Sequence, residues 1–174
     1  RRVLFRSTAP PGLQLPVQDL AACRGEEQAI ALDLQGNGAI TITYRLNEGP
    51  EESQEFTGAG RRMLPIDRGG NYRIIRVRDA GCEVSVDETV RADFYQPAIN
   101  PRLVNPTCAE RSDGSISITH LPTVPPYEYR WTGLNPTGLS AENLPAGKYS
   151  LQVIDALGCR AERALDRPSP DPLH

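Results

Sequence analysis

Two stretches of the chain decide the fold because they repeat one pattern. The first reads Gly70-Asn71-Tyr72-Arg73-Ile74-Ile75-Arg76-Val77-Arg78-Asp79-Ala80-Gly81-Cys82, and the second reads Gly147-Lys148-Tyr149-Ser150-Leu151-Gln152-Val153-Ile154-Asp155-Ala156-Leu157-Gly158-Cys159. In both, the tyrosine stands ten positions before the cysteine, and an Asp-Ala pair follows an apolar-rich segment. Such self-similarity indicates two copies of one structural unit. The aspartate comes one position later in the first copy, which predicts a longer strand or a β-bulge there.

The segments upstream of each copy also match. In the first, Cys23 is followed by an alternating segment at 29–34, and in the second, Cys108 is followed by one at 115–119. Apolar and polar residues also alternate over 40–45 and over 127–131. A period of two is typical of half-buried β-strands, so these segments predict strands.

Composition agrees with an all-β fold. The chain has 16 prolines and 15 glycines, which break it into short elements joined by turns. Apolar residues make up only 39% of the sequence, so each core is expected to be thin. We predict two tandem antiparallel β-sandwich domains.

The domain limits follow from the repeat. We place the first domain at 12–96 and the second at 97–168, because Gln96–Pro101 has two prolines and no periodicity. Pro97 and Pro101 are expected to limit bending at this junction. The ends, 1–11 and 169–174, are expected to be unstructured or linker. The N-terminal residues do not have the features of a signal peptide, and we expect the chain to be part of a longer protein.

Two further segments of the first repeat are assigned from their composition. The last strand of this repeat is expected at about 83–95, after the cysteine. The charged, glycine-containing stretch from Gly49 to Arg62 is expected to be a solvent-exposed loop.

Each repeat contains two of the four cysteines, at matching places. Small domains with thin cores are often held by disulfides in oxidising compartments, and a bridge that closes about 50–60 residues contributes about 4 kcal/mol in the chain-entropy model. We therefore predict the pairs Cys23–Cys82 and Cys108–Cys159, and an exported chain. Unpaired thiols are the open alternative, because the second cysteine follows the penultimate strand and the strand order decides whether the sulfurs meet.

Aromatic side chains are the other notable group. Tyr72 and Tyr149 each open a strand after a glycine, where immunoglobulin-like sandwiches place a corner tyrosine, and we assign both to the structural core. Trp131 shares a face with Tyr127 and Tyr129. We assign Trp131 to the core, and the three rings together are the alternative candidates for stacking against sugar rings.

Catalytic and metal chemistry finds little support. The chain has two histidines, His120 and His174, so neither a histidine-based triad nor a histidine-rich metal site can be assembled. We predict no enzyme activity, no catalytic residue, no zinc site and no cofactor. Calcium is an open alternative at Asp79, Asp113 and Asp155, which flank turns and carry the oxygen ligands that calcium prefers.

Charge and hydropathy restrict the partners. The formal net charge is −3, with acidic and basic residues mixed along the chain and no basic stripe to follow a phosphate backbone. No run of about 18 apolar residues is present. We therefore expect no nucleic-acid partner and no membrane insertion.

The second repeat contains a string of motifs, namely Cys108, Asp113-Gly114-Ser115-Ile116, Pro125-Pro126-Tyr127-Glu128-Tyr129-Arg130-Trp131, Leu144-Pro145-Ala146-Gly147-Lys148-Tyr149 and Asp155-Ala156-Leu157-Gly158-Cys159. This string closely resembles the SprB-type repeat over roughly Asn105 to Ala161. The resemblance implies a tandem immunoglobulin-like module of the long extracellular adhesins of gliding and other Bacteroidota. It transfers no catalytic residue.

The first repeat is a looser relative of the second. It keeps Ile42-Thr43-Tyr44, Phe56-Thr57-Gly58 and Gly70-Asn71-Tyr72, but it lacks the Pro-Tyr-x-Tyr-x-Trp strand. It also resembles the lumenal immunoglobulin-like repeats of membrane nucleoporins, which share a Gly-x-Tyr strand followed by an Asp and a Cys.

Two functional hypotheses follow. The first is a structural or adhesive repeat of an exported cell-surface protein, a rigid spacer whose loops contact other surfaces. Its expected partners are neighbouring repeats of the same parent chain and a surface polysaccharide or protein. The alternative is a carbohydrate-binding module that uses exposed aromatics around Trp131, and the exposure of that ring discriminates between the two.

Overall fold

The computed structural model describes residues 9–108, 111–120, 123–134 and 138–168. Over these ranges the regular elements are all β-strands, as predicted. They are β1 (Gly12–Gln14), β2 (Asp19–Cys23), β3 (Gln28–Gln35), β4 (Ile40–Leu46), β5 (Glu51–Phe56), β6 (Gly60–Ile66), β7 (Gly70–Arg78), β8 (Glu83–Tyr95), β9 (Ile99–Val104), β10 (Gly114–His120), β11 (Glu128–Thr132), β12 (Ser140–Leu144), β13 (Gly147–Ile154) and β14 (Arg160–Arg167). Within the described ranges there is no helix with the length and hydropathy needed to cross a membrane.

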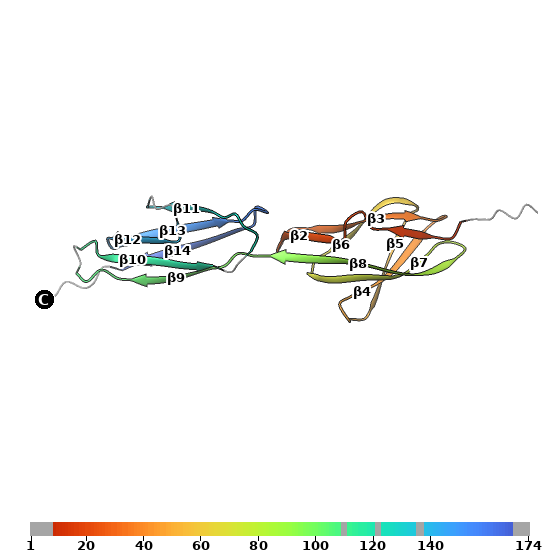
Figure 1. The fold of residues 1–174 in the computed structure, drawn as a ribbon, viewed down its shortest axis with the longest axis horizontal. Coiled ribbons are helices and arrows are strands. Elements are labelled where there is room, and N and C mark those ends of the chain that lie inside the picture. The colour runs from red at the N-terminus through yellow and green to blue at the C-terminus, as the bar shows by residue number, and fades with distance from the viewer. Residues whose placement is uncertain (1–8, 109–110, 121–122, 135–137, 169–174) are drawn as a thin grey trace, which may run out of the picture. The chain divides into compact units, whose positions relative to one another are not determined.

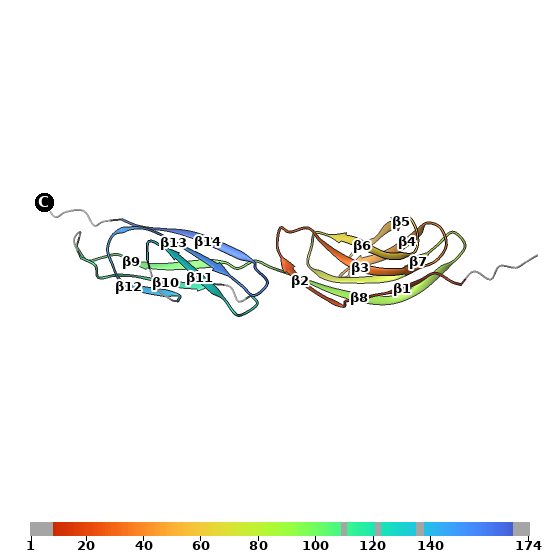
Figure 2. The same ribbon diagram turned by 90° about the horizontal axis from the view of Figure 1, so that it is seen from above.

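The chain divides into two compact units, Arg1–Phe94 and Tyr95–His174. In both views the strands of each unit run roughly along its length (Figures 1 and 2). Of the ends predicted at 1–11 and 169–174, residues 1–8 and 169–174 lie outside the described residues, and residues 9–11 are not part of a strand.

The first unit is a sandwich of two sheets. One sheet has the order β1-β3-β6, and the other has the order β2-β8-β7-β4-β5. In the first sheet, β3 pairs antiparallel with both β1 and β6. In the second sheet, β4 pairs antiparallel with β5 and β7, and β7 pairs antiparallel with β8. The unit forms because its strands alternate, so that every second side chain faces the opposite sheet.

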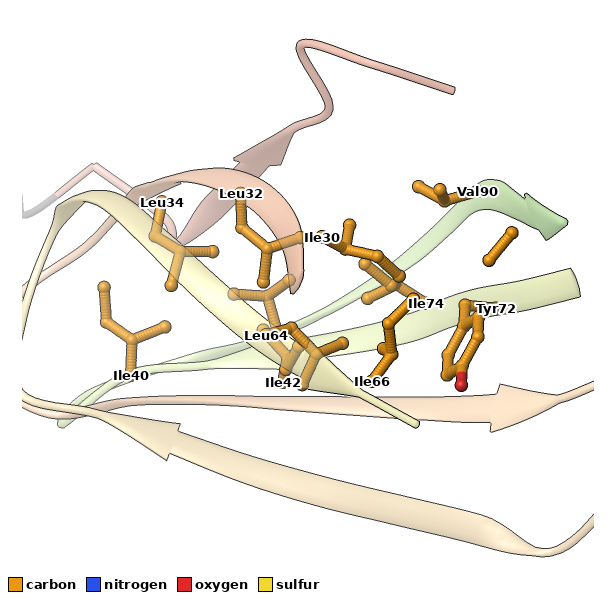
Figure 3. Packing of buried hydrophobic residues seen from close by; sticks show 12 residues of the cluster. Ile30, Leu32, Leu34, Ile40, Ile42, Leu64, Ile66, Tyr72, Ile74 and Val90 are labelled. Atoms are coloured by element: carbon orange, nitrogen blue, oxygen red, sulfur yellow. The ribbon is translucent and has the colours of Figure 1, made fainter. Parts of the chain in front are cut away.

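Figure 3 shows the core of this unit, in which side chains from β3 face those from β4 and β7 across the space between the sheets. Leu32, Ile40, Ile42 and Ile74 are each fully buried, with 0% of their surface exposed. Tyr72 is packed at one end of the same cluster. The predicted alternation over 40–45 therefore forms a core-facing strand.

The second unit is a smaller sandwich made of the sheets β12-β10-β9 and β11-β13-β14. Its core contains Ile116, Ile118, Leu151 and Val153, which alternate along β10 and β13. Tyr127, Tyr129 and Trp131 pack against this cluster from the β11 side.

Two sequence-based expectations are wrong. The stretch 49–62 is not a loop: β5 spans its first half and pairs with β4, and β6 begins within it. β5 is mostly exposed at the sheet edge, which explains why its sequence is charged. Pro101 does not belong to a junction either, because it lies in β9, opposite Ile118. Proline is tolerated there because β9 is an edge strand.

Two finer expectations are confirmed. β7 is one residue longer than its counterpart β13, and its register with β8 shifts between Ile74 and Arg76. This irregularity is the predicted accommodation of the later aspartate. The last strand of the first repeat spans Glu83–Tyr95 as expected.

Candidate functional site

The corner tyrosines occupy equivalent positions in the two units. The Tyr72 hydroxyl donates a hydrogen bond to the Arg68 carbonyl oxygen at 2.7 Å, and the Tyr149 hydroxyl donates to the Pro145 carbonyl oxygen at 2.9 Å. Both bonds reach back four residues, and the rings are only 3% and 8% exposed. Burial raises the pKa of Tyr72. Each hydroxyl therefore fixes the chain that leads into its strand.

The two cysteine-containing turns are capped in a similar way, each by the side chain of the aspartate at its start. In the β7–β8 turn, Asp79 Oδ1 accepts hydrogen bonds from the Gly81 and Cys82 backbone N–H groups, at 2.9 and 2.8 Å. In the β13–β14 turn, Asp155 Oδ1 accepts from the Leu157 and Cys159 N–H groups, both at 2.9 Å. A carboxylate that accepts from adjacent N–H groups shapes a tight turn.

Asp79 makes one more contact than Asp155. Its Oδ2 atom accepts a hydrogen bond from the Asn37 N–H at 2.9 Å, which ties the turn to the β3–β4 connection. The N–H groups of Gly81, Asn37 and Cys82 favour the charged form and lower the pKa of Asp79. Asp155 Oδ2 is buried without a hydrogen-bond partner among the described residues.

The predicted disulfide pairs are absent from the structure. Cys82 and Cys108 are free and exposed, whereas Cys23 and Cys159 are disulfide-bonded. The lengths and order of the strands explain why the predicted pairs do not form.

The end of a unit at which the chain enters is called its N-terminal pole, and the end at which the chain leaves is called its C-terminal pole. In the first unit the two cysteines lie at opposite poles. Cys82 precedes β8, whereas Arg24, next to Cys23, lines a depression together with Ala92 and Phe94 near the end of β8. About ten strand residues separate these levels, which is about 30 Å at about 3.3 Å per residue. A disulfide requires Cα atoms within about 7 Å, so the unit itself holds Cys23 and Cys82 apart.

The second unit repeats this separation. Cys159 precedes β14, and at the other end of β14 Arg167 donates to the Val104 carbonyl oxygen. Cys108 stays near that end, because Thr107 N–H donates to Asp113, beside the start of β10, at 2.9 Å. The length of β14 puts about 25 Å between the levels of the two cysteines. The sequence did contain a signal for this separation, because the second cysteine of each repeat stands just before a long final strand.

The aromatic row of β11 faces inward. The Trp131 indole N–H donates to the Gly138 carbonyl oxygen at 2.8 Å, and the ring is half-buried against the core opposite Leu151. The Tyr127 hydroxyl exchanges hydrogen bonds with the backbone of Thr123, at 3.1 and 3.2 Å. Burial raises the pKa of Tyr129. The row therefore does not present a flat, exposed platform for stacking sugar rings.

Arg167 is a structural residue that the sequence did not single out. It ends β14 with 1% of its surface exposed, and its Nη1 donates to the Leu144 and Pro145 carbonyl oxygens at 3.1 and 3.4 Å. Its Nη2 donates to the Val104 carbonyl oxygen. Its guanidinium lies against Gly114, where an added Cβ would come within 1.4 Å of Nη2. The guanidinium therefore ties the backbones of two segments, the end of β9 and the β12–β13 turn, to the end of β14 at the C-terminal pole.

The calcium alternative gains no support. Asp79 and Asp155 accept backbone hydrogen bonds, and Asp113 accepts from the Thr107 N–H and hydroxyl groups at 2.9 and 2.5 Å. In the part of the chain that the structure describes, no three His, Cys, Asp or Glu residues gather in a way that would hold a metal ion. His174 lies outside the described residues, and the backbone of His120 ends β10.

These features define a class of protein: tandem immunoglobulin-like β-sandwich modules with corner tyrosines and carboxylate-capped hairpins. The families that match are the nucleoporin POM152 immunoglobulin-like domain, over residues 12–91, and the SprB repeat, over residues 102–136. Both resemblances found in the sequence are thereby confirmed, one in each unit. A search of curated proteins finds no match.

Among solved structures, the C-terminal 282-residue fragment of intimin, in complex with the intimin-binding domain of the translocated intimin receptor, matches with a TM-score of 0.53 and 13% identity. The match covers 93% of this chain and 64% of the intimin chain. The titin I-band fragment I67–I69 has a TM-score of 0.47 and 16% identity, over 91% of this chain and 65% of that one. This chain thus spans less than two thirds of both structures, and at 13% identity the likeness to the intimin fragment shows the fold alone.

Proposed function

We propose that the chain is a non-catalytic structural and adhesive segment of a cell-surface protein. In this role its two modules are spacers in series, and their turns and loops contact a surface protein or polysaccharide. The proposal includes export to an oxidising environment, which suits a chain with disulfide-bonded cysteines.

The observation that carries the spacer role is the path of the chain through each module. In the first, Gly12 pairs with Gln35 at the end of β3, whereas the chain leaves at the far end of β8. In the second, Ile99 pairs with His120, and the chain leaves at Arg167, which binds the other end of β9. The chain enters one pole and leaves the other, so tension is carried along the length of each sandwich.

Two separate cores support the same role. Each unit buries its own apolar cluster, and the two clusters share no residue. A domain with its own hydrophobic core can fold alone, so we expect each unit to unfold under force as a separate element. For the adhesive role, the intimin fragment supplies the precedent of a similar fold in complex with a receptor domain.

Pulling the reduced chain by its two ends in an optical trap tests the spacer role. We expect two cooperative unfolding steps, each releasing about 25–30 nm, because about 80 residues extend at about 3.6 Å each. The Leu151→Ala variant, which opens a cavity in the second core, should weaken one step and leave the other unchanged. A single step for the whole chain, or extension without steps, would contradict the proposal.

A further inference from the structure

The four cysteines fall into two structural classes. Cys82 and Cys159 follow the same aspartate-capped turn and precede the last strand of their units. Cys23 comes before β3 in the first unit, and Cys108 comes before β10 in the second. The first class lies at the N-terminal pole of each module, and the second class lies at the C-terminal pole.

One member of each class is oxidised. Cys23 and Cys159 are disulfide-bonded, while Cys82 and Cys108, in the same structural positions of the other unit, are free and exposed. Both positions therefore allow a disulfide in this fold. The strand lengths exclude a bond between the two classes inside one module, because about 25–30 Å separates the poles.

We infer that Cys82 and Cys108 are the joining points between copies of this module: the C-terminal-pole cysteine of one chain bonds the N-terminal-pole cysteine of the next. For this chain the predicted partner is a second copy of itself, joined through Cys108 of one copy and Cys82 of the other. The inference deepens the spacer proposal and rests on it, since a bond of this kind fastens spacers head to tail.

Local structure presents both thiols. The Asp79 carboxylate holds the Cys82 N–H in the turn, so the residue is fixed at the tip of the hairpin and exposed. At the C-terminal pole, the Cys108 carbonyl oxygen accepts a hydrogen bond from the Arg111 N–H at 3.1 Å. The neighbouring Thr107 N–H donates a hydrogen bond to Asp113. Cys82 is therefore exposed in a hydrogen-bonded turn, and Cys108 is exposed next to a residue that Asp113 holds.

The chemistry balances with a small-molecule disulfide as the oxidant. The thiolate of Cys82, after losing its proton to solvent, attacks oxidised glutathione, forms a mixed disulfide and releases one glutathione thiolate. The Cys108 thiolate of a second copy then attacks the Cys82 sulfur and releases the second glutathione. Two electrons pass from the two cysteines to the glutathione disulfide. Because the joined sites differ, the linkage is heterologous and forms an open series.

Two single variants separate this inference from random oxidation. In a glutathione redox buffer, the unsubstituted chain should form a ladder of oligomers on a non-reducing gel, with a Cys82–Cys108 link in the peptide map. Neither Cys82→Ser nor Cys108→Ser should form oligomers alone. An equal mixture of the two should form dimers, at least tenfold more than either variant by itself, and nothing larger.

Dimers of either single variant, equal in amount to those of the mixture, would overturn the inference, because they would require Cys82–Cys82 or Cys108–Cys108 bonds. Monomers carrying only glutathione on both cysteines would also overturn it. Circular dichroism of each variant confirms that the serine leaves the fold intact. If the unsubstituted chain forms no oligomers but still unfolds in two steps in the optical trap, only the joining role is rejected. If the two unfolding steps are absent, the spacer function is rejected.

Discussion

The two modules solve the same packing problem with different resources. The first adds β2 and β5 to its second sheet, and its buried apolar cluster has twelve members among the described residues. In the described part of the second, each sheet has three strands and the cluster has nine members. The smaller module compensates with Arg167, which holds the backbones of β9 and the β12–β13 turn. A small sandwich thus concentrates its stability in a few contacts, where a larger one spreads it over strands.

The sharpest test of this contrast is Gly114→Ala. The added methyl group would take the place of the Arg167 guanidinium, since the Cβ position lies 1.4 Å from Nη2 and 2.3 Å from Cζ. Displacing this side chain overpacks the site and strips its hydrogen bonds from three carbonyl groups. We expect the second module to lose about 3 kcal/mol. The chain has one tryptophan, Trp131, so its fluorescence during urea unfolding follows this module alone.

A matched control and a double variant sharpen this measurement. Gly138→Ala, where no atom lies within 4 Å of the added Cβ, should change stability by less than about 0.5 kcal/mol. With Arg167→Ala already in place, Gly114→Ala should cost little more, because the clash is gone. Equal costs of Gly114→Ala in both backgrounds would show that Arg167 is not the reason for the glycine.

The corner tyrosines provide the next comparison. Tyr72→Phe and Tyr149→Phe each remove one hydroxyl bond of similar length, to the Arg68 and Pro145 carbonyls. Each should cost about 1 kcal/mol in its own module, or about 4–8 °C in Tm for a domain of this size. Hydrogen exchange of the whole chain, resolved by peptide, assigns the loss to one module. If either variant weakens both modules equally, the two cores are coupled.

The sequence predicted much of this architecture because period-two alternation and repeated turns are local signals. The strands over 40–45 and 83–95 and the bulge in the first tyrosine strand could all be located in this way. The same alternation placed Trp131 on one face with Tyr127 and Tyr129, and the usual place of tryptophan in such sandwiches assigned that ring to the core.

What the sequence could not supply depends on contacts between distant segments. Whether Cys23 meets Cys82 depends on which end of β8 lies beside β2, and no local pattern encodes this. The role of Arg167 could not be predicted from the sequence either, because it depends on three carbonyl groups that lie far from it along the chain. The edge strand β5 was mistaken for a loop because edge strands carry charged residues.

The capped turns differ in their expected response to acid. The pKa of Asp79 is lowered in the folded first module by three backbone N–H groups, so the unfolded chain takes up a proton first as the pH falls. Its contribution is complete above the ordinary value of 3.8 and is lost as the pH falls through the lower, folded-state pKa. Asp79→Asn should therefore flatten the acid limb of the stability curve of the first module.

The measurement is hydrogen exchange of first-module peptides after incubation between about pH 5 and pH 2, the range in which such carboxylates titrate. Asp19→Asn, at the exposed start of β2, is the matched control and should leave the slope as it is. An acid limb that Asp79→Asn leaves unchanged would show that the turn is not held by the ionised carboxylate.

The smallest expected effect concerns the outward face of the first module. Arg73 forms a bidentate pair with Asp87 there, at 2.6 and 3.0 Å, and the two side chains are 54% and 67% exposed. The guanidinium lowers the pKa of Asp87, but water and salt screen a pair this exposed. Asp87→Asn should leave the Tm of the first module within the scatter of replicate calorimetric scans, at both low and high salt. A clear, salt-dependent decrease in Tm would mean that the larger module also depends on single polar contacts. The two modules would then differ only in how strongly they depend on such contacts.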